Sequence, residues 1–359
     1  MAGIDGSNRL KLGLFCYNVE GGVALTTVPE RWSARWDDIV AAVQIAERYG
    51  LEFVLPVARW RGFGEENRRG ACFETITQAA ALASLTRRIT LFATIHVPLI
   101  HPLLAAKMLA TVDHASHGRA GLNIVAGWNQ EEFDMFGLVQ RDHADRYAQA
   151  REWCVLFRRL IAGGAPFDHE GEFYRGRGMV VAPGAMQERL PILNAAVSPE
   201  GRAFALEFSD YIFTFAASAE GVAAGADRNV GAMTTSYVVC RPSREEAEAY
   251  HRHYAGTMAD TILLDRTLQS KTRQLAHHFP GDAAADDPVR LRYAGGNGSH
   301  PLIGSPDEVA EQLIELSSRG FAGTTLSFVN FTEELPYFCE TVLPILQRAG
   351  LRSGVLESV

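Results

Sequence analysis

Few side chains in this sequence have the types and spacing that nucleophilic, acid–base or metal chemistry requires. The chain contains neither a Gly-x-Ser-x-Gly elbow, which would expose a nucleophilic serine, nor a Gly-Lys-Ser/Thr phosphate-binding loop. His96 and His101 are separated by a segment that contains a proline, so their spacing does not suggest a common metal site. We therefore expect no metal and no protein nucleophile.

Hydrogen-bonding and aromatic side chains are concentrated where apolar runs end. Asn123 lies inside the apolar run GLNIVA (121–126), which stops at Gly127-Trp128. A buried carboxamide costs free energy unless its polar atoms find partners. Similar side chains lie in the neighbouring runs or directly after them: Arg59, Trp60, Arg61, Thr94, Phe215 and Phe328. A site of amides, hydroxyls, an arginine and aromatic rings is suited to orienting a planar cofactor that performs the bond breaking itself.

The segment VSPEG (197–201) has the pattern of a helix start. Ser198 is a good N-cap residue and Pro199 suits the first helical position. The free N–H groups and the positive dipole end of such a helix attract a phosphate. Plain helix capping explains the same residues, so the segment is a candidate phosphate site and no more at this point.

Eight apolar runs alternate with helical patterns along the chain. The runs are 12–17, 52–56, 89–96, 121–126, 191–195, 211–215, 234–240 and 324–329. Most are continuously apolar, as expected for parallel strands that are covered on both faces. The alternation predicts a (β/α)8 barrel, with a doubly wound open sheet as the alternative.

The helical patterns between these runs carry recognisable start and stop signals. They cover 37–50, 73–86, 102–116, 143–161, 243–256, 305–320 and 334–349. In the sixth, Ser305, Pro306 and Glu308 form the pattern of a capping box. In a barrel, functional groups lie at the carboxyl ends of the strands, where the residues named above are found.

Three segments interrupt the simple alternation of a single domain that spans 1–359. Residues 57–72 are rich in Arg and Gly, 166–190 resemble a small hairpin, and 257–300 are long and end in GGNGSHP. Long inserts on a barrel are commonly lids or substrate loops, although a surface insert explains 166–190 equally well.

The composition is that of an ordinary globular protein. Of its 359 residues, 47% are hydrophobic and 21% are charged. A net charge of −8 without a dense Lys/Arg run argues against a nucleic-acid partner. The sequence shows neither a signal-peptide pattern nor an apolar run that could span a bilayer, so we expect a cytoplasmic protein without a membrane partner. The five widely spaced cysteines, without a Cys-x-x-Cys, fit reduced thiols.

Several of these segments together resemble a known family. The string ATVDHASHGRAGLNIVAGW (110–128) and the later pair Arg146-Tyr147 form a specific combination. Further matching segments are ARWRGFG (58–64), AAVSPEG (195–201) and the run 305–346. The chain resembles the bacterial luciferase-like flavin monooxygenases over nearly its whole length. Within that family, its RGFG run is similar to that of pyrimidine oxygenases and its NVEGG run (18–22) to that of dimethylsulfone monooxygenases.

The resemblance implies a TIM-barrel enzyme that takes reduced FMN from a separate NAD(P)H:flavin reductase. Such enzymes react the flavin with O2 and oxygenate a small substrate through a flavin peroxide. Amides, N-heterocycles and organosulfur compounds are the candidate substrate classes. The resemblance also implies a homo-oligomer, either a dimer or a tetramer.

Matching positions carry the family's roles onto individual residues. Asn123 would hydrogen-bond the flavin edge, and Thr94 beside it would help to hold O2, as in pyrimidine oxygenases. Dimethylsulfone enzymes have Ala at the Thr94 position, which favours the pyrimidine-oxygenase type of oxygen chemistry. The other implied flavin contacts are Ala58, Arg59 and Glu132 around the ring, and Arg146, Tyr147 and Ser198 around the phosphate. The candidates for the substrate wall are Trp60, Arg61, Trp128, Phe215 and Phe328.

Two departures from the family pattern keep alternatives open. The loop before Ser198 is usually rich in glycine but reads Ala195-Ala196 here, and the two methyl groups would crowd a phosphate. The segment 219–230 is short, so a helix expected there is trimmed. A deazaflavin-dependent dehydrogenase on the same fold and a noncatalytic flavin-binding relative therefore stay as alternative functions.

Overall fold

The computed structural model describes residues 3–63, 68–127, 129–195, 198–214, 230–274 and 287–353. A closed barrel of eight parallel strands lies at its centre. Around the barrel the strands follow the order β1 (Lys11–Phe15), β2 (Phe53–Leu55), β3 (Thr90–His96), β4 (Ala120–Val125), β7 (Ile192–Ala195), β8 (Tyr211–Phe213), β9 (Gly231–Cys240) and β11 (Gly323–Ser327). The pairing of β11 with β1 and of β8 with β9 closes the ring. The predicted (β/α)8 barrel is confirmed, and the open-sheet alternative is wrong.

All eight expected strands are present, and a ninth strand was not expected from the sequence. β10 (His300–Gly304) pairs in parallel with β9 along its residues 236–240, beyond the part of β9 that pairs with β8. Its sequence, HPLIG, is short and contains both Pro and Gly, so it gives little strand signal. It adds to the sheet without entering the closed ring.

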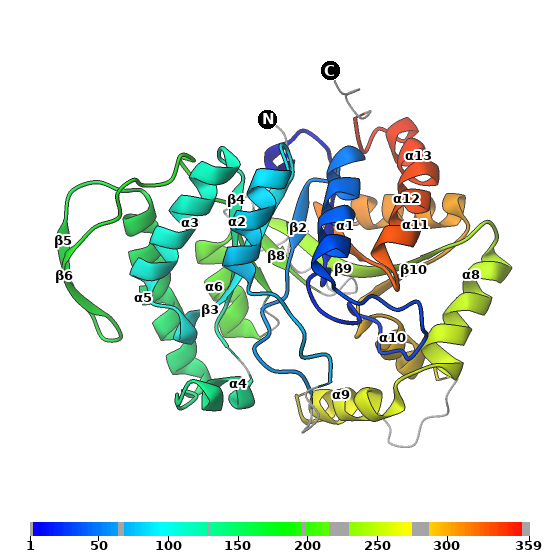
Figure 1. The fold of residues 1–359 in the computed structure, drawn as a ribbon, viewed down its shortest axis with the longest axis horizontal. Helices are drawn as coiled ribbons and strands as arrows, with labels where there is room; N and C mark the ends of the chain where they lie inside the picture. The colour runs from blue at the N-terminus through cyan, green and yellow to red at the C-terminus, as the bar shows by residue number, and fades with distance from the viewer. Residues whose placement is uncertain are drawn as a thin grey trace.

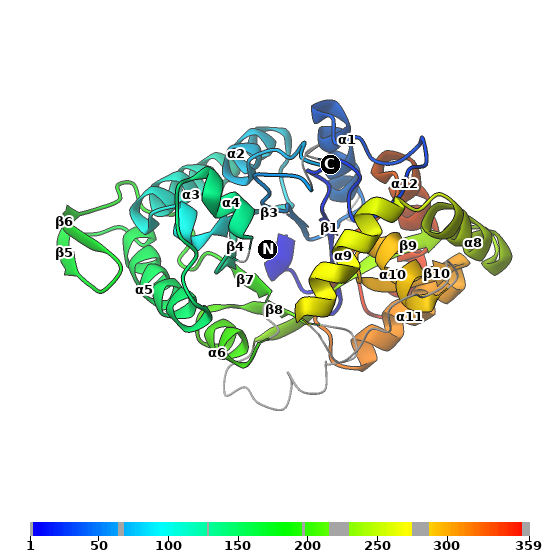
Figure 2. The ribbon, with the colours of Figure 1, turned by 90° about the horizontal axis from the view of Figure 1, so that it is seen from below.

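Helices surround the strands (Figures 1 and 2). They are α1 (Trp36–Arg48), α2 (Thr75–Leu85), α3 (Pro102–Ser116), α4 (Gln130–Met135), α5 (His143–Ile161), α6 (Pro199–Phe208), α8 (Arg244–His251), α9 (Thr261–Gln274), α10 (Pro288–Gly296), α11 (Pro306–Ser318), α12 (Phe331–Thr341) and α13 (Leu343–Arg348). The capping box of α11 is formed, because Glu308 Oε2 accepts a hydrogen bond of 2.9 Å from the Ser305 amide. The single helix expected over 334–349 is two helices, since a proline begins α13. None of the described helices is long and apolar enough to cross a membrane.

The three inserts have different structures. Residues 166–190 contain the expected hairpin of β5 (Phe167–Glu170) and β6 (Arg175–Met179), which projects away from the barrel (Figure 1). The insert over 257–300, in which no helix or strand was predicted, contains α9 and α10 and leads into β10. Figure 1 shows α9 at the same end of the molecule as α4, opposite both chain termini. Most of the short segment 219–230 lies outside the described residues.

The barrel interior next to the polar residues of the mouth is filled by aromatic and aliphatic side chains. A buried cluster there contains Ile4, Phe53, Leu55, Phe92, Leu193, Phe213 and Met233. The rings of Phe53 and Phe92 meet edge to face at 5.8 Å between centroids. A Cβ atom at Gly121 would lie 2.5 Å from the Phe92 ring, so this ring position requires a glycine on β4. This apolar layer fills the barrel interior behind the polar residues at the carboxyl ends of the strands.

A buried ion pair joins the C-terminal segment to the base of the barrel. Arg352 Nη1 lies 2.8 Å from Glu52 Oε2, and both side chains are 3% exposed. The same guanidinium donates to the carbonyls of Leu10 and Gly50, at 2.9 and 2.7 Å. Glu52 Oε2 also accepts from the Leu12 amide at 2.7 Å. The pair stabilises the base because every charged group has several hydrogen-bond partners.

We predict that Arg352→Met lowers the free energy of unfolding by about 3–5 kcal/mol, since it leaves the Glu52 carboxylate buried without its cation. Urea denaturation of the whole chain measures the loss. Arg35→Met is the control, because Arg35 pairs with Asp38 at 2.9 Å on the surface and should change little. Equal stability of the two variants would show that the buried pair contributes nothing.

Candidate active site

The polar side chains of the barrel mouth come from alternate positions on β3 and β4. On β3, Phe92 belongs to the apolar layer, and Thr94 and His96 follow on the same face, two residues apart. The parallel pairing of β3 with β4 places Thr94 directly beside Asn123. The strand register therefore brings together the two residues to which the family resemblance assigns a role in oxygen chemistry.

Thr94 and Asn123 form a chain of hydrogen bonds that leaves one atom free. The Thr94 hydroxyl donates to the Pro56 carbonyl at 2.5 Å, and it accepts from Asn123 Nδ2 at 3.1 Å. Asn123 Oδ1 is buried and has no hydrogen-bond partner among the described residues. An unpaired buried acceptor costs about 1–3 kcal/mol. Asn123 therefore presents a ready acceptor to a molecule that enters the barrel mouth.

Asn123 lines a cavity of about 260 Å³ at the carboxyl ends of the strands. Its size is just below the usual range of small-molecule sites, about 300–1,000 Å³. The lining contains six of the expected site residues: Ala58, Arg59, Arg61, Thr94, Asn123 and Glu132. Phe15, Leu55, Val125 and Phe213 supply apolar walls. The cavity thus combines a few polar groups with apolar surfaces, as a site for a planar ring requires.

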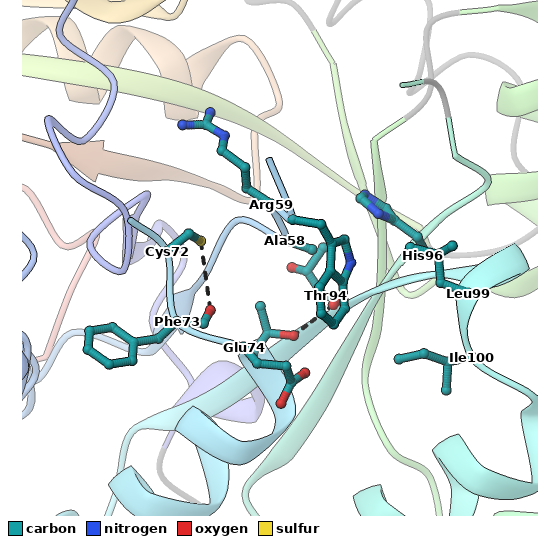
Figure 3. A pocket seen from close by; sticks show the side chains of 11 residues that line it. Ala58, Arg59, Cys72, Phe73, Glu74, Thr94, His96, Leu99 and Ile100 are labelled. Carbon is teal, nitrogen blue, oxygen red and sulfur yellow. Dashed lines mark hydrogen bonds between the residues drawn. The ribbon is translucent and has the colours of Figure 1, made fainter. Parts of the chain in front are cut away.

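A smaller chamber of about 50 Å³ adjoins this cavity (Figure 3). Ala58, Arg59, Thr94 and His96 line both spaces, and Trp60 lines the small chamber. In Figure 3, Cys72, Phe73 and Glu74 lie across the chamber from His96, Leu99 and Ile100. The shared residues make the small chamber a side pocket of the main cavity.

His96 and Glu132 form a buried pair at the mouth. His96 Nδ1 lies 3.5 Å from Glu132 Oε2, and each side chain is 7% exposed. Glu132 Oε1 accepts a hydrogen bond of 2.9 Å from the Trp60 amide. Burial lowers the pKa of His96, and the Glu132 carboxylate offsets part of that effect. Glu132 was expected from family resemblance alone, and its pairing with His96 was not expected.

Two arginines hold the loop that follows β2. Arg69 donates to the carbonyls of Glu20 and Gly22, at 3.0 and 2.6 Å, and burial lowers its pKa to about 10. Arg59 Nη1 donates to the Arg69 carbonyl at 3.2 Å, and its guanidinium lies 4.9 Å from the Phe63 ring centroid. Within the described residues, Arg59 forms no ion pair with a carboxylate. Arg59 is therefore a cavity cation without an ion-pair partner among the described carboxylates.

The three expected phosphate ligands lie at the starts of α5 and α6, two helices that pack against each other (Figure 2). Ser198 caps α6, because its hydroxyl accepts from the Gly201 amide at 3.1 Å. The Tyr147 ring contacts His143 of its own helix and Phe204 of α6, with centroids 5.1 and 5.8 Å away. Arg146 Nη1 donates to the Gly127 carbonyl at 2.5 Å, and its buried Nε has no described partner. The capping prediction for Ser198 is confirmed.

The remaining candidates are placed differently. Phe328 is buried against Phe331 and Phe338 of α12, outside the residues that line the cavity, so the structure gives it a packing role. Trp128 and Phe215 lie outside the described residues. Ala195 lines the cavity, whereas Ala196 is not described, so crowding of a phosphate by these two methyl groups stays a prediction.

A family model described as luciferase-like monooxygenase matches residues 10–323. The chain belongs to the luciferase-like monooxygenase family. The predicted family is confirmed, and with it the predicted class of enzyme, a monooxygenase.

Relatives of this luciferase-like chain have two kinds of substrate in their names. An FMNH2-dependent dimethylsulfone monooxygenase of Pseudomonas putida is 29% identical, over 95% of this chain and 96% of the relative. A pyrimidine monooxygenase RutA of Stutzerimonas stutzeri is 31% identical, over 89% of this chain and 91% of the relative. Among solved structures, a riboflavin lyase with modified FMN and riboflavin has a TM-score of 0.83 at 23% identity, covering 97% of this chain and 94% of that one. That last likeness supports the fold alone.

We predict that Gly127→Ala destabilises the protein more than Gly137→Ala. Both glycines have positive φ angles, 90° and 66°, but a Cβ atom at Gly127 would lie 2.5 Å from the Phe133 ring while Gly137 faces open space. Overpacking should add about 1–3 kcal/mol to the loss at Gly127. Urea denaturation of both variants measures the difference, and equal losses would mean that the contact with Phe133 relaxes freely.

Proposed function

We propose that this protein is a two-component monooxygenase that receives reduced FMN from a separate flavin reductase and uses O2 to oxygenate a small substrate. The observation that carries the proposal is the buried Thr94–Asn123 pair, in which Asn123 lines the cavity at the barrel mouth and keeps a buried Oδ1 without a described partner. Reduced FMN, when bound, supplies the two electrons with which O2 is split between the substrate and water.

The donor set fits the ring of a reduced flavin. A reduced flavin carries N–H groups, and Asn123 Oδ1 is an acceptor without a described partner. Ala58, Arg59 and Glu132 line the same cavity and would surround the ring. The apolar side chains of Phe15 and Phe213 would exclude water from it. Thr94 would help Asn123 to position O2, because its hydroxyl is held in place by the Pro56 carbonyl.

The starts of α5 and α6 would hold the phosphate of FMN. Arg146 brings a positive charge and a buried Nε that has no described partner. Ser198 and the first amides of α6 offer the positive end of a helix dipole. Tyr147 is fixed between the two helices by its ring contacts.

The names of the curated relatives support a small substrate that carries nitrogen or sulfur. Trp60 and Arg61 are the described candidates for its wall, and Trp60 is 38% exposed at the edge of the small chamber. The expected homo-oligomer and the cytoplasmic location stay predictions. Uracil and dimethyl sulfone are suitable first probes, because each represents one of the two groups of relatives.

We predict that Arg146→Met weakens the binding of FMN about 10- to 100-fold and leaves riboflavin binding unchanged, because riboflavin lacks the phosphate. The range corresponds to one charge-assisted hydrogen bond. Anaerobic titration with both reduced flavins measures it, with Arg35→Met as the control. An equal loss for the two flavins would place the phosphate elsewhere.

We predict that the protein consumes O2 and forms an oxygenated product when FMN, NADH and a generic flavin reductase are supplied with uracil or dimethyl sulfone. Asn123→Leu should abolish product formation, since it removes the free acceptor at similar volume. Product analysis by mass spectrometry in ¹⁸O2 measures incorporation of one oxygen atom. Preferred binding of a deazaflavin with no such incorporation would favour the dehydrogenase, and flavin binding without turnover would favour a noncatalytic relative.

A further inference from the structure

The pair of His96 and Glu132 has a geometry that the proposed use of FMN and O2 does not explain. Glu132 faces the Nδ1 side of the imidazole at 3.5 Å, and its other oxygen is fixed by the Trp60 amide at 2.9 Å. A carboxylate that faces one ring nitrogen favours the tautomer whose proton lies on that nitrogen, even at an ion-pair distance longer than a usual hydrogen bond. The opposite nitrogen, Nε2, is then an unprotonated acceptor.

His96 borders the space where a substrate would lie. The residue lines both the main cavity and the small chamber, two positions along β3 from Thr94. Its Nε2 has no hydrogen bond to a described residue. Burial lowers the pKa of the ring, so that the neutral form, which can take up a proton, is present at neutral pH.

A cation lies in the same lining. Arg59 also borders both spaces, and it forms no ion pair with a described carboxylate. Arg61, in contrast, lies 3.5 Å from Glu131. A base and a cation in one lining favour a ligand that loses a proton and becomes an anion.

We propose that His96 is a catalytic base, oriented by Glu132, and that the substrate carries an acidic N–H or O–H group that is bound as its anion next to Arg59. This inference rests on the proposed function. The N–H or O–H bond breaks, its electron pair stays on the substrate, and the proton bonds to His96 Nε2. The imidazolium is stabilised by Glu132. It returns the proton during the same turnover, to the product or to the oxygen atom that leaves as water.

The test uses N–H heterocycles and compounds without an acidic proton. The probes are uracil and hydantoin, their fully N-methylated counterparts, and dimethyl sulfone, each with reduced FMN and O2. The wild-type protein should oxygenate at least one N–H probe, and its N-methylated counterpart at least 100-fold more slowly. Failure of both N–H probes contradicts the inference, whether or not dimethyl sulfone reacts. Titration with reduced FMN tells this failure apart from a failure of the proposed function.

His96→Gln should lower kcat/KM for the N–H probe about 10²- to 10⁴-fold, the usual contribution of a general base. The wild-type kcat/KM should fall at acidic pH, through a pKa below the ordinary histidine value, and this limb should vanish in the variant. Added imidazole should restore part of the activity of His96→Ala. His101→Asn is the matched control, because Asn preserves the cap that His101 gives α3.

The fall of kcat/KM at acidic pH must also be distinguished from the titration of other ionisable groups around the imidazole. Glu132 faces it from α4, and Arg59, Cys72 and Glu74 line the adjoining chamber. Glu132→Gln should retain the limb but shift it to lower pH, because the imidazolium loses its carboxylate. A His96→Gln variant with the wild-type pH profile, or with no rescue of His96→Ala by imidazole, overturns the proposal.

Discussion

The hydrogen bond between Asn123 and Thr94 determines what the barrel mouth can bind. The Thr94 hydroxyl has one proton, and it uses this proton on the Pro56 carbonyl. It can therefore only accept from Asn123 Nδ2, which fixes the carboxamide with its oxygen unpaired. Because side chains alternate along a strand, a slip of β4 by one residue would turn Asn123 out of the barrel. The pairing of β3 with β4 thus sets the chemistry of the site.

The order of the barrel strands could be predicted because each is a short apolar run between helical patterns with clear caps. The features that the sequence did not predict depend on contacts between distant segments. β10 contains Pro and Gly and is a strand only because β9 offers a free edge. The helices α9 and α10 lie in a long insert, and α9 begins two residues after Ala259, which pairs with Thr26. Such pairings between remote parts of the chain leave no local pattern.

The site could be predicted in part for the same reason. Thr94 and Asn123 are polar residues inside two apolar runs, and family resemblance supplied Arg146, Tyr147 and Ser198. The ion pair of His96 with Glu132 joins a strand to the short helix α4, and no spacing rule relates the two residues. Arg69 likewise gives no local signal, yet its hydrogen bonds join the insert 57–72 to the NVEGG segment.

The two ends of the barrel differ in whether their buried polar atoms have hydrogen-bond partners. At the base, Arg352 and Glu52 are fully supplied with partners, so this end gains stability without a ligand. At the mouth, Asn123 Oδ1 and Arg146 Nε are buried without described partners. Each such atom costs about 1–3 kcal/mol until a ligand satisfies it. A cofactor that bonds to both atoms would remove these costs in the bound state alone. The protein therefore keeps its stability at one end of the barrel and leaves the other end with unsatisfied groups that favour binding.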